Sequence, residues 1–408
     1  MRLVIYSHYF APSIGGVENI VRKLATGLAV PEVPGSASEF NTVVVTQTEA
    51  RGFDDSTLPF QVVRRPGIFE LARLIRDSDV LHIAGPALLP LFLARLFRKS
   101  VVVEHHGYQA ICPNGSLIQQ PEGDVCPGHF QARGYAACYR CQKAEFSPLH
   151  SLRTLILTGL RGWLCRGVEN VAISHHVTER LVSLFPSQVI YYGIEDRKAE
   201  PVSRPQENIQ RSGICFAYVG RFVSEKGIPV LLDAARRLTD EGLAFDLCLV
   251  GDGPDREQLQ SKILNSGLDS FTKITGFLHG EALNGLLEKV DAVVMPSVCE
   301  ETAGLAAIEQ MMRGRLVIAS SIGGLAEVVS DAGMLFAPRD VGALAACMKA
   351  VIEKPALVTQ LGAKARQRAL DLFTGSRMLD EHAQLYRRLA DRNSKEAGAT
   401  VKNPGVPY

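Results

Sequence analysis

The sequence predicts an α/β fold made of two doubly wound, Rossmann-like domains that face each other across a cleft. Short apolar, β-branched runs such as "RLVIYS", "VVVEHHG" and "DAVVMPS" alternate with longer segments of helical period, which is the pattern of βαβ units and parallel sheets. A polar, proline-bearing stretch, "EDRKAEPVSRPQENIQRSG", separates these runs into two sets. With 408 residues, each half is long enough to bury its own core.

The domain boundaries follow from where this rhythm stops. We expect residues 1–195 to form the first domain, which is interrupted by an insertion at residues 108–148 because that segment is rich in Cys, Pro and Gly and has no sustained apolar period. Residues 196–374 form the second domain. A helix at 375–392 has apolar residues at helical spacing and is expected to pack back on the first half, and residues 393–408 read as a disordered tail.

Composition excludes several classes of protein. Lys and Arg together number 44 against 43 for Asp and Glu, so no global field draws the chain to nucleic acid or to an anionic membrane. No apolar stretch is long enough for a transmembrane helix, and the short apolar start is too short for a signal peptide. Nine cysteines, an odd number, argue against a secreted disulfide scaffold. We therefore expect a cytoplasmic protein.

The stretch "EETAGLAAIE" places acidic residues on both sides of a helix start. If the helix begins near Ala303, Glu301 lies on the preceding loop, Glu309 lies one to two turns into the helix, and the amides of Gly304 and Leu305 point outward. Free amides at a helix start bind anions, and the flanking acids then suit hydroxyl groups attached at both ends of a diphosphate. The alternative is that the acidic residues only interact with the helix dipole.

Two further motifs follow strands. "GRFVSEKG" places Arg221 and Lys226 after the first strand of the second half, where a guanidinium and an ammonium can hold a diphosphate together. The alternative for this pair is ordinary solvated surface charge. Near the start of the chain, "SHYFAPSIGGVE" offers a glycine pair that ends at Gly16 and opens the first helix, so backbone can approach a phosphate closely.

These motifs and their order resemble the retaining glycosyltransferases of family 4, which have the GT-B fold. The resemblance runs over nearly the whole chain: a glycine pair near residue 16, "HHG", "GRFVSEKG", "LVGDGPDR", "TGFL", "PSVCEETAGLAAIE" and "IASSIGGLAE". The most specific part is the pair of glutamates eight residues apart that ends in "GLAAIE". Ala303 stands where the family usually has phenylalanine, and Tyr192 replaces a frequent asparagine.

The resemblance implies roles for individual residues. Arg221 and Lys226 would grip the donor diphosphate, Glu309 the ribose, and Glu301 the hydroxyl groups of the transferred sugar. The remaining donor-binding positions are glycines, backbone amides and residues near the base: Gly16, Gly253, Phe277, Leu278, Gly304 and Leu305.

His106, at the end of "VVVEHHG", is similar to the active-site histidine of that family. Side chains alternate along a strand, so only one of His105 and His106 is expected to face the cleft, and the neighbouring glycine favours His106. The alternative is a strand-end histidine that bonds to backbone.

The expected reaction is transfer of a sugar from a UDP- or GDP-sugar to a saccharide or lipid-linked acceptor with retention of configuration, in polysaccharide or glycoconjugate biosynthesis. Arg221, Lys226 and helix amides can neutralise the leaving diphosphate, so we expect no cofactor for catalysis, and no metal-binding motif of the D-x-D kind occurs. Hydrolysis by two carboxylates fits the loop and helix placement poorly.

Four cysteines in the insertion, spaced C-x13-C-x11-C-x2-C, form a second candidate site. They are Cys112, Cys126, Cys138 and Cys141. The closing C-x2-C favours a structural zinc ion, with disulfide or redox use and free thiols as alternatives.

Other functions stay open at this stage. A nucleotide-sugar epimerase would share the fold, as would a non-catalytic sensor of nucleotide sugars. A nicotinamide dehydrogenase is less consistent, because "GDGPDR" has Arg256 where the third fingerprint glycine belongs. The segment 149–167 mixes apolar residues with arginines, which favours a cross-sheet helix with a basic face in water, or a peripheral contact with the inner face of a membrane.

Overall fold

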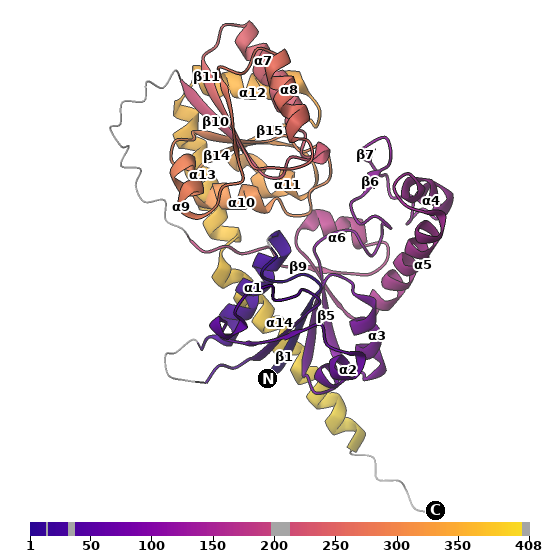
Figure 1. The fold of residues 1–408 in the computed structure, drawn as a ribbon. Helices are drawn as coiled ribbons and strands as arrows, with labels where there is room; N and C mark the ends of the chain where they lie inside the picture. The colour runs from indigo at the N-terminus through magenta and orange to yellow at the C-terminus, as the bar shows by residue number, and fades with distance from the viewer. Residues whose placement is uncertain (14, 32–36, 197–212, 402–408) are drawn as a thin grey trace, which may run out of the picture. The chain divides into compact units, whose positions relative to one another are not determined.

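The computed structural model describes residues 1–13, 15–31, 37–196 and 213–401. It divides into two compact domains (Figure 1). Residues 1–121, 126–193 and those from 375 onward form the N-terminal domain, whereas residues 194–374 form the C-terminal domain, with which residues 122–125 cluster. Most of the expected inter-domain linker (197–212) and the end of the expected tail (402–408) lie outside the described residues.

The N-terminal domain is built on a parallel seven-stranded sheet in the order β3-β2-β1-β4-β5-β8-β9. Its strands are β1 (Arg2–Ser7), β2 (Asn41–Thr46), β3 (Gln61–Arg64), β4 (Val80–Ala84), β5 (Ser100–His105), β8 (Glu169–Ala172) and β9 (Gln188–Val189). The central strands are buried almost throughout, which is why they read as continuous apolar runs.

The helices of this domain connect and cover the strands. They are α1 (Gly16–Ala29), η1 (Asp55–Thr57), α2 (Ile68–Arg76), α3 (Leu88–Leu96), α4 (Tyr135–Lys143), α5 (Pro148–Cys165), α6 (His175–Leu181) and α14 (Gly375–Val401). The insertion also contains the short strands β6 (Ile118–Gln119) and β7 (Asp124–Val125). Helix α4 lies inside a segment whose sequence shows no helical period, so packing against α5 stabilises it.

The C-terminal domain is built on a parallel six-stranded sheet in the order β12-β11-β10-β13-β14-β15. Its strands are β10 (Ile214–Val219), β11 (Phe245–Val250), β12 (Thr272–Gly276), β13 (Ala292–Met295), β14 (Leu316–Ser320) and β15 (Met334–Phe336). Numbered along the chain this order is 3-2-1-4-5-6, the doubly wound arrangement expected from the alternating pattern.

The helices of the C-terminal domain are η2 (Ser224–Lys226), α7 (Ile228–Asp240), α8 (Arg256–Asn265), α9 (Gly280–Leu287), α10 (Leu305–Met312), α11 (Gly323–Val329), η3 (Ser330–Ala332), α12 (Val341–Glu353) and α13 (Ala356–Leu372). Helices α7 and α12 pack together against the strands, and Phe216, Phe245 and Leu247 are fully buried in the resulting core. The loops at the carboxyl ends of the strands are thereby fixed to a rigid support.

The last helix, α14, belongs to the N-terminal domain, where it packs against α1, β4 and β5. It runs to Val401, so the tail predicted to be disordered from residue 393 begins as a continuation of this helix. The sequence "SKEAGA" has good helix formers and no proline, which explains why the helix does not end at 392.

Candidate active site

The strand order of the C-terminal sheet brings two of the predicted motifs together. Strands β10 and β13 are neighbours, and the chain leaves them toward opposite edges of the sheet. Ligands of doubly wound proteins bind at such a switch point, outside the carboxyl ends of the strands. Arg221 and Lys226 follow β10, whereas Glu301 and Gly304 follow β13. The motifs are therefore adjacent although about 75 residues separate them in the sequence.

Lys226 and Glu301 form the central contact of this site. The Lys226 ammonium donates to Glu301 Oε1 at 2.8 Å, and the Ser297 hydroxyl donates to the same oxygen at 2.5 Å. The two charged side chains are 27% and 20% exposed, so they are accessible from one side. The Val298 amide donates to the Glu225 carbonyl at 3.0 Å, which ties the two loops together. Ser297 was not predicted, although its place directly after the strand-ending "MP" could have indicated it.

The pair shifts both pKa values toward the charged forms. Burial alone would raise the pKa of Glu301, but the charge of Lys226 and the hydrogen bonds from Lys226 and Ser297 outweigh it and lower that pKa. Burial alone would lower the pKa of Lys226, but the Glu301 carboxylate outweighs it and raises that pKa. Both groups are therefore ionised at neutral pH.

Glycines let these loops pack directly on one another. Gly227 has φ = +66°, and a Cβ at this position would lie 1.9 Å from the carbonyl oxygen of Pro296. At the start of α11, a Cβ on Gly323 would lie 2.6 Å from the Glu301 carbonyl oxygen, and one on Gly324 would lie 2.3 Å from that of Thr302. The two glycines of "IASSIGGLAE" thus let the start of α11 pack directly against the backbone of the Glu301 loop.

Helix α10 begins at Leu305, slightly later than the predicted start near Ala303. The reason is Gly304, which has φ = +59° and forms the N-cap in the left-handed region. The amides of Ala307 and Ile308 donate to the Gly304 carbonyl, which leaves the preceding amides of Leu305 and Ala306 at this end of α10 for an anion. Glu309 lies in the second turn and is exposed.

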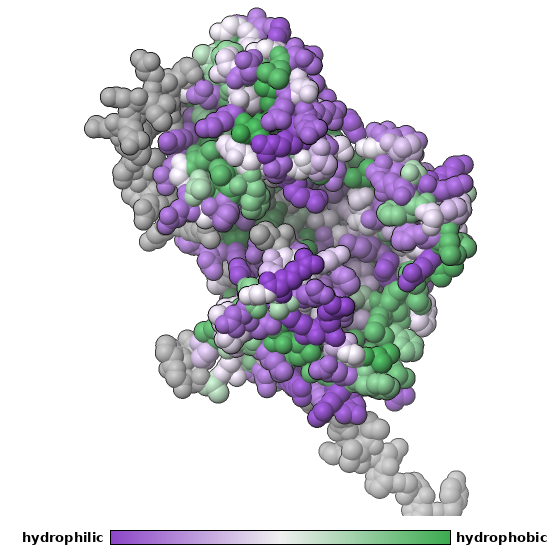
Figure 2. All heavy atoms as spheres, viewed as in Figure 1, coloured by the Kyte–Doolittle hydropathy of each residue, from purple (hydrophilic) through white to green (hydrophobic). Residues whose placement is uncertain are grey.

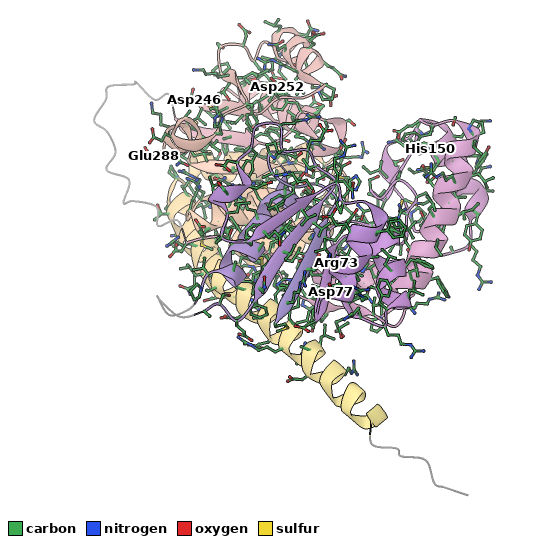
Figure 3. The ribbon with its side chains drawn as sticks, turned by 60° about the horizontal axis from the view of Figure 1, so that its bottom comes forward. Arg73, Asp77, His150, Asp246, Asp252 and Glu288 are labelled. Carbon is green, nitrogen blue, oxygen red and sulfur yellow. The ribbon has the colours of Figure 1, made fainter. Side chains whose placement is uncertain are left out.

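Arg221 lies on a loop that is packed against the loop following β11. Its carbonyl accepts the Tyr218 hydroxyl at 2.8 Å, and a Cβ on Gly253 would lie 2.3 Å from the Phe222 carbonyl oxygen. The Arg221 side chain is exposed and forms no salt bridge with any residue that the structure describes. By contrast, Asp252, which Figure 3 labels, pairs with the neighbouring Arg256 at 2.7 Å.

The residues predicted to meet the base follow β12. Phe277 is 60% exposed and Leu278 is half-buried. Together, the predicted residues of the C-terminal domain follow four neighbouring strands, β12, β11, β10 and β13, and thus lie along one edge of one sheet.

His106 lies at the corresponding edge of the N-terminal sheet, directly after β5. Its Nδ1 is 2.5 Å from the Tyr192 hydroxyl, and its Nε2 is 3.5 Å from Glu104 Oε2. Burial lowers its pKa, and the Glu104 carboxylate only partly offsets this. His105 points to the other side of the strand, where it stacks on Phe185 and contacts Asn170 Oδ1 at 2.9 Å. Burial lowers the pKa of His105 to about 4.

Gly16 begins α1, at the same edge of the N-terminal sheet. Its neighbour Gly15 is the extended N-cap residue, and the Glu18 carboxylate lies directly over the place where a Gly15 Cβ would be, with Oε2 at 2.2 Å. Glu18 also raises the pKa of Tyr192, after burial and Glu104. Gly16 and His106 are thus linked through the surroundings of Tyr192, in a different domain from Lys226 and Glu301.

The four cysteines of the insertion are free thiols. Burial and the proximity of Cys112, Cys126 and Cys141 raise the pKa of Cys138 to about 12. Cys141 Sγ accepts the Gln120 amide at 3.3 Å. Among the described residues, the group of three ligand atoms within 4.8 Å of one another is formed by His82, Glu104 and His382, and it does not include these sulfurs.

Residues 200–368 match the family of glycosyl transferases, group 1. The chain is 28% identical over 246 residues to 2-deoxystreptamine glucosyltransferase of Streptomyces kanamyceticus, which covers 55% of this chain and 62% of that protein. It is 34% identical over 171 residues to glycogen synthase of Mycobacterium tuberculosis, with 41% of each chain covered. The chain thus spans less than two thirds of the length of these curated relatives.

Solved structures resemble almost the whole chain. Anabaena HepE in complex with UDP has a TM-score of 0.71 at 16% identity and covers 95% of this chain and 100% of that one. HepE in complex with UDP-glucose has a TM-score of 0.69 at 17% identity with the same coverage. The fold is therefore GT-B, with two Rossmann-like domains, as the sequence predicts. No helix in the described part of the chain has the length and apolarity needed to cross a membrane.

Proposed function

We propose that this chain, which has the GT-B fold and a group 1 glycosyl transferase domain, is a glycosyltransferase that moves a sugar from a nucleotide-diphosphate donor to a saccharide or lipid-linked acceptor with retention of configuration. We infer a UDP- or GDP-sugar as donor and biosynthesis of a polysaccharide or glycoconjugate as the setting. The crystallised HepE complexes, which hold UDP or UDP-glucose, make UDP the first nucleotide to test.

The Lys226–Glu301 pair at the switch point carries this proposal. A polar pair that is partly exposed and held by two loops bonded to each other is suited to exchange partners with a ligand that carries both anionic and hydroxyl groups. Lys226 and the exposed Arg221 supply positive charge for a diphosphate, and Glu301 supplies an acceptor for sugar hydroxyls. An ion pair with a purely structural role can be fully buried. The partial exposure of Lys226 and Glu301 therefore favours a role in binding a ligand.

The chemistry follows from charge. As the bond between the anomeric carbon and the phosphate oxygen breaks, negative charge grows on the diphosphate, and the two cations with the first-turn amides of α10 stabilise it. The acceptor oxygen attacks on the face that the nucleotide leaves, and its proton passes to the departing phosphate oxygen. The products are a glycoside of unchanged configuration and a nucleoside diphosphate. No step requires a divalent cation.

The other predicted residues complete the proposal. Glu309, exposed in the second turn of α10, would bind the ribose hydroxyls, and the backbone at Phe277 and Leu278 would contact the base. Gly253 would line the same edge. We assign His106 to the transferred sugar and Gly16 to the phosphates on the family resemblance alone.

A screen followed by product analysis tests this function. Thermal shifts with UDP-, GDP-, ADP- and TDP-sugars, measured with a chelator present, identify the donor; one nucleotide class is expected to raise the melting temperature. Mass spectrometry of reactions with candidate acceptors then detects the added sugar, and the anomeric proton coupling constant of the product reports its configuration. Release of free sugar alone indicates a hydrolase, an inverted product excludes the retaining mechanism, and conversion of the donor without an acceptor supports the epimerase.

We also propose that the protein contacts a membrane surface through helices α3 and α5, as a lipid-linked acceptor would require. The exposed side chains on one stripe of α5 are apolar, contrary to the predicted basic face in water: Leu149, Leu152, Ile156, Leu160 and Trp163. Helix α3 packs beside α5 and exposes Leu89, Phe92 and Leu96. Figure 2 shows apolar side chains gathered over these helices, and we call them the α3–α5 apolar face.

The charges around this face suit an anionic bilayer. Neither α3 nor α5 contains an Asp or Glu, whereas Arg95, Arg153 and Arg161 are basic. The Arg95 guanidinium lies 5.7 Å from the centre of the Trp163 ring, so the basic groups border the apolar ones. Apolar groups that insert beside cations that attract anionic headgroups are typical of interfacial helices.

Vesicle flotation tests the membrane contact. The wild-type chain is expected to float with vesicles of phosphatidylcholine and phosphatidylglycerol, and the double variant Leu152→Ser, Ile156→Ser to stay in solution. Leu264→Ser, at an equally exposed leucine on α8, is the control and should float like the wild type. Equal flotation of all three proteins contradicts the lipid proposal. So does a wild-type protein that is dimeric in solution when the double variant is monomeric, because the face would then be a dimer interface.

For the insertion, we propose that Cys112, Cys126, Cys138 and Cys141 hold a structural zinc ion. The proximity of the other three cysteines to Cys138 and the amide donated to Cys141 suit metal ligands, and metal binding would deprotonate the thiols to thiolates. Metal analysis of the wild type and of the double variant Cys138→Ser, Cys141→Ser tests this, because loss of about one zinc per chain is expected.

A further inference from the structure

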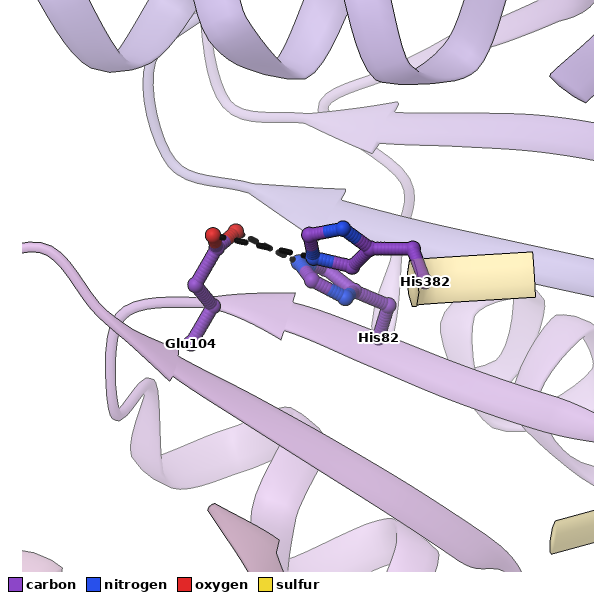
Figure 4. A group of neighbouring side chains, drawn as sticks. All are labelled: His82, Glu104 and His382. Atoms are coloured by element: carbon purple, nitrogen blue, oxygen red, sulfur yellow. Dashed lines mark ion pairs between the residues drawn. The ribbon is translucent and has the colours of Figure 1, made fainter. Parts of the chain in front are cut away.

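The N-terminal domain buries a polar group that the proposed transfer does not use. Figure 4 shows its three side chains: Glu104 on β5, His82 on the neighbouring β4, and His382 on α14. All three are fully buried. Because α14 packs on β4 and β5, the group joins His82 to His382, which is 300 positions later in the sequence.

The contacts inside the group are longer than charge-assisted hydrogen bonds. His82 Nε2 lies 3.2 Å from Glu104 Oε2, and His382 Nε2 lies 3.7 Å from Glu104 Oε1. None of these four buried atoms has a hydrogen-bond partner among the described residues. A charge-assisted N–H···O contact would be about 2.7 to 2.9 Å long. Four polar atoms thus converge in a fully buried place, at separations longer than a charge-assisted hydrogen bond.

The outer nitrogens show how the imidazoles are oriented. His382 Nδ1 lies 2.8 Å from the Met378 carbonyl, which can only accept, so Nδ1 carries the hydrogen and a neutral ring turns the lone pair of Nε2 toward Glu104. His82 Nδ1 lies 2.9 Å from the Tyr386 hydroxyl. Histidines that bind metals have their second nitrogen held in this way. A buried lone pair that faces a carboxylate is repelled by it, and a cation between them would remove this repulsion.

We propose that His82, Glu104 and His382 bind a divalent transition-metal ion, most compatibly zinc, that fastens α14 to the central strands of the N-terminal sheet. Ligands about 2.0 to 2.1 Å from a tetrahedral zinc are about 3.3 to 3.4 Å apart, and the observed 3.2 and 3.7 Å lie on either side of this spacing. Two imidazoles and both oxygens of one carboxylate supply four donor atoms. The site has no opening for a water ligand, which fits a structural ion.

The proposed ion would lie close to a third imidazole, that of His106. His106 Nε2 lies 3.5 Å from Glu104 Oε2, so the carboxylate lies between the proposed ion and the histidine assigned to the sugar. Because no substrate contact is invoked, the proposal stands or fails independently of glycosyl transfer.

The experiment must separate this site from the cysteine site. The full chain with Cys138→Ser and Cys141→Ser lacks two of the four sulfur ligands, and its metal content is measured by mass spectrometry after extensive chelator washing. We expect about one zinc per chain to remain, with an X-ray absorption shell of nitrogen and oxygen at about 2.0 to 2.1 Å and no sulfur at about 2.3 Å. This measurement needs no change at the proposed ligands.

Variants then assign the ion. In the same background, His382→Gln is expected to lose the zinc, whereas His105→Gln, at a buried histidine on the opposite side of β5, should keep it. Folded, metal-free protein in the background variant overturns the proposal, as does zinc content unchanged by His382→Gln. Nitrogen NMR that finds His382 as a protonated imidazolium in metal-free, folded protein identifies the positive charge as a proton and also overturns it.

Discussion

The two sheets share their central strand order, but they differ in whether the ionisable side chains of neighbouring strands are exposed or buried. In the C-terminal domain, Lys226 and Glu301 follow neighbouring strands and stay partly exposed. In the N-terminal domain, Glu104 and His82 lie within neighbouring strands and are fully buried. Charge beyond the strand end can exchange its partner for a ligand, whereas charge inside the sheet must be matched permanently by the protein or by an ion. The first arrangement suits binding, and the second suits structure.

The largest expected effect lies at the buried carboxylate. Glu104→Gln should lower the free energy of unfolding by about 3 to 5 kcal/mol, because it leaves the buried imidazoles and any bound cation without their anion. Denaturant unfolding measures the change. The control is Glu39→Gln, at an exposed pair with Arg387 that also joins α14 to this domain and should cost less than about 1 kcal/mol. If both variants lower the free energy of unfolding by the same amount, the buried carboxylate is no more important to stability than the exposed one.

At the exposed pair, the effect should fall on activity. Lys226→Ala is expected to reduce kcat/KM by about ten- to a hundredfold, equivalent to about 1.5 to 3 kcal/mol of lost charge-assisted contact with the diphosphate. Lys262→Ala removes the ammonium of another ion pair in the same domain, with Asp233, and should leave activity unchanged. Steady-state kinetics with the identified donor measures kcat/KM of both variants. Similar values would show that Lys226 has only a structural role.

Two glycine-to-alanine substitutions should change the stability of the protein in opposite directions. Gly304→Ala should destabilise the protein by about 1 to 2 kcal/mol, because φ = +59° strains any residue with a Cβ. Gly285→Ala, inside α9 with open space around the new Cβ, should instead stabilise by about 0.5 to 1 kcal/mol. Thermal unfolding of both variants checks the pair, and a stabilising Gly304→Ala would mean that the α10 start adopts another backbone conformation.

The smallest effect is a pH dependence. Glu301 has a lowered pKa, so its pairing stabilises the fold above the ordinary carboxyl range and is lost as pH falls through the lowered value. Lys226 has a raised pKa, so its contribution is present at neutral pH and is lost only at high alkaline pH. The stability difference between the wild type and Glu301→Gln should therefore be constant near neutrality and shrink in acid. A difference that grows in acid contradicts this pairing.

The sequence predicted the repeated βαβ pattern and the motifs after each strand, because both are local. It could not predict that β10 and β13 are neighbours, which depends on strand order, and it therefore missed the direct contact of Lys226 with Glu301 and the role of Ser297. Gly323 and Gly324 were seen only as a motif, since the backbone they approach lies about 20 residues earlier in the sequence.

The buried group in the N-terminal domain was invisible for the same reason. His82 reads as one polar residue in an apolar strand, and His382 as part of an ordinary amphipathic helix. Only the packing of α14 on β4 and β5 brings them to Glu104. The exposed apolar stripe of α5 was also misjudged, because periodicity identifies a helix face but not whether the protein covers it.

Calorimetric titration of UDP and of uridine into the wild type and Arg221→Ala tests most directly that the C-terminal domain binds a diphosphate through its cations. Arg221 is the residue to change, since it is exposed and pairs with no described carboxylate. UDP affinity should fall about tenfold or more while uridine affinity stays the same. Equal weakening of both ligands, or of neither, would show that the guanidinium does not contact the phosphates. GDP and guanosine replace them if the donor screen selects guanine.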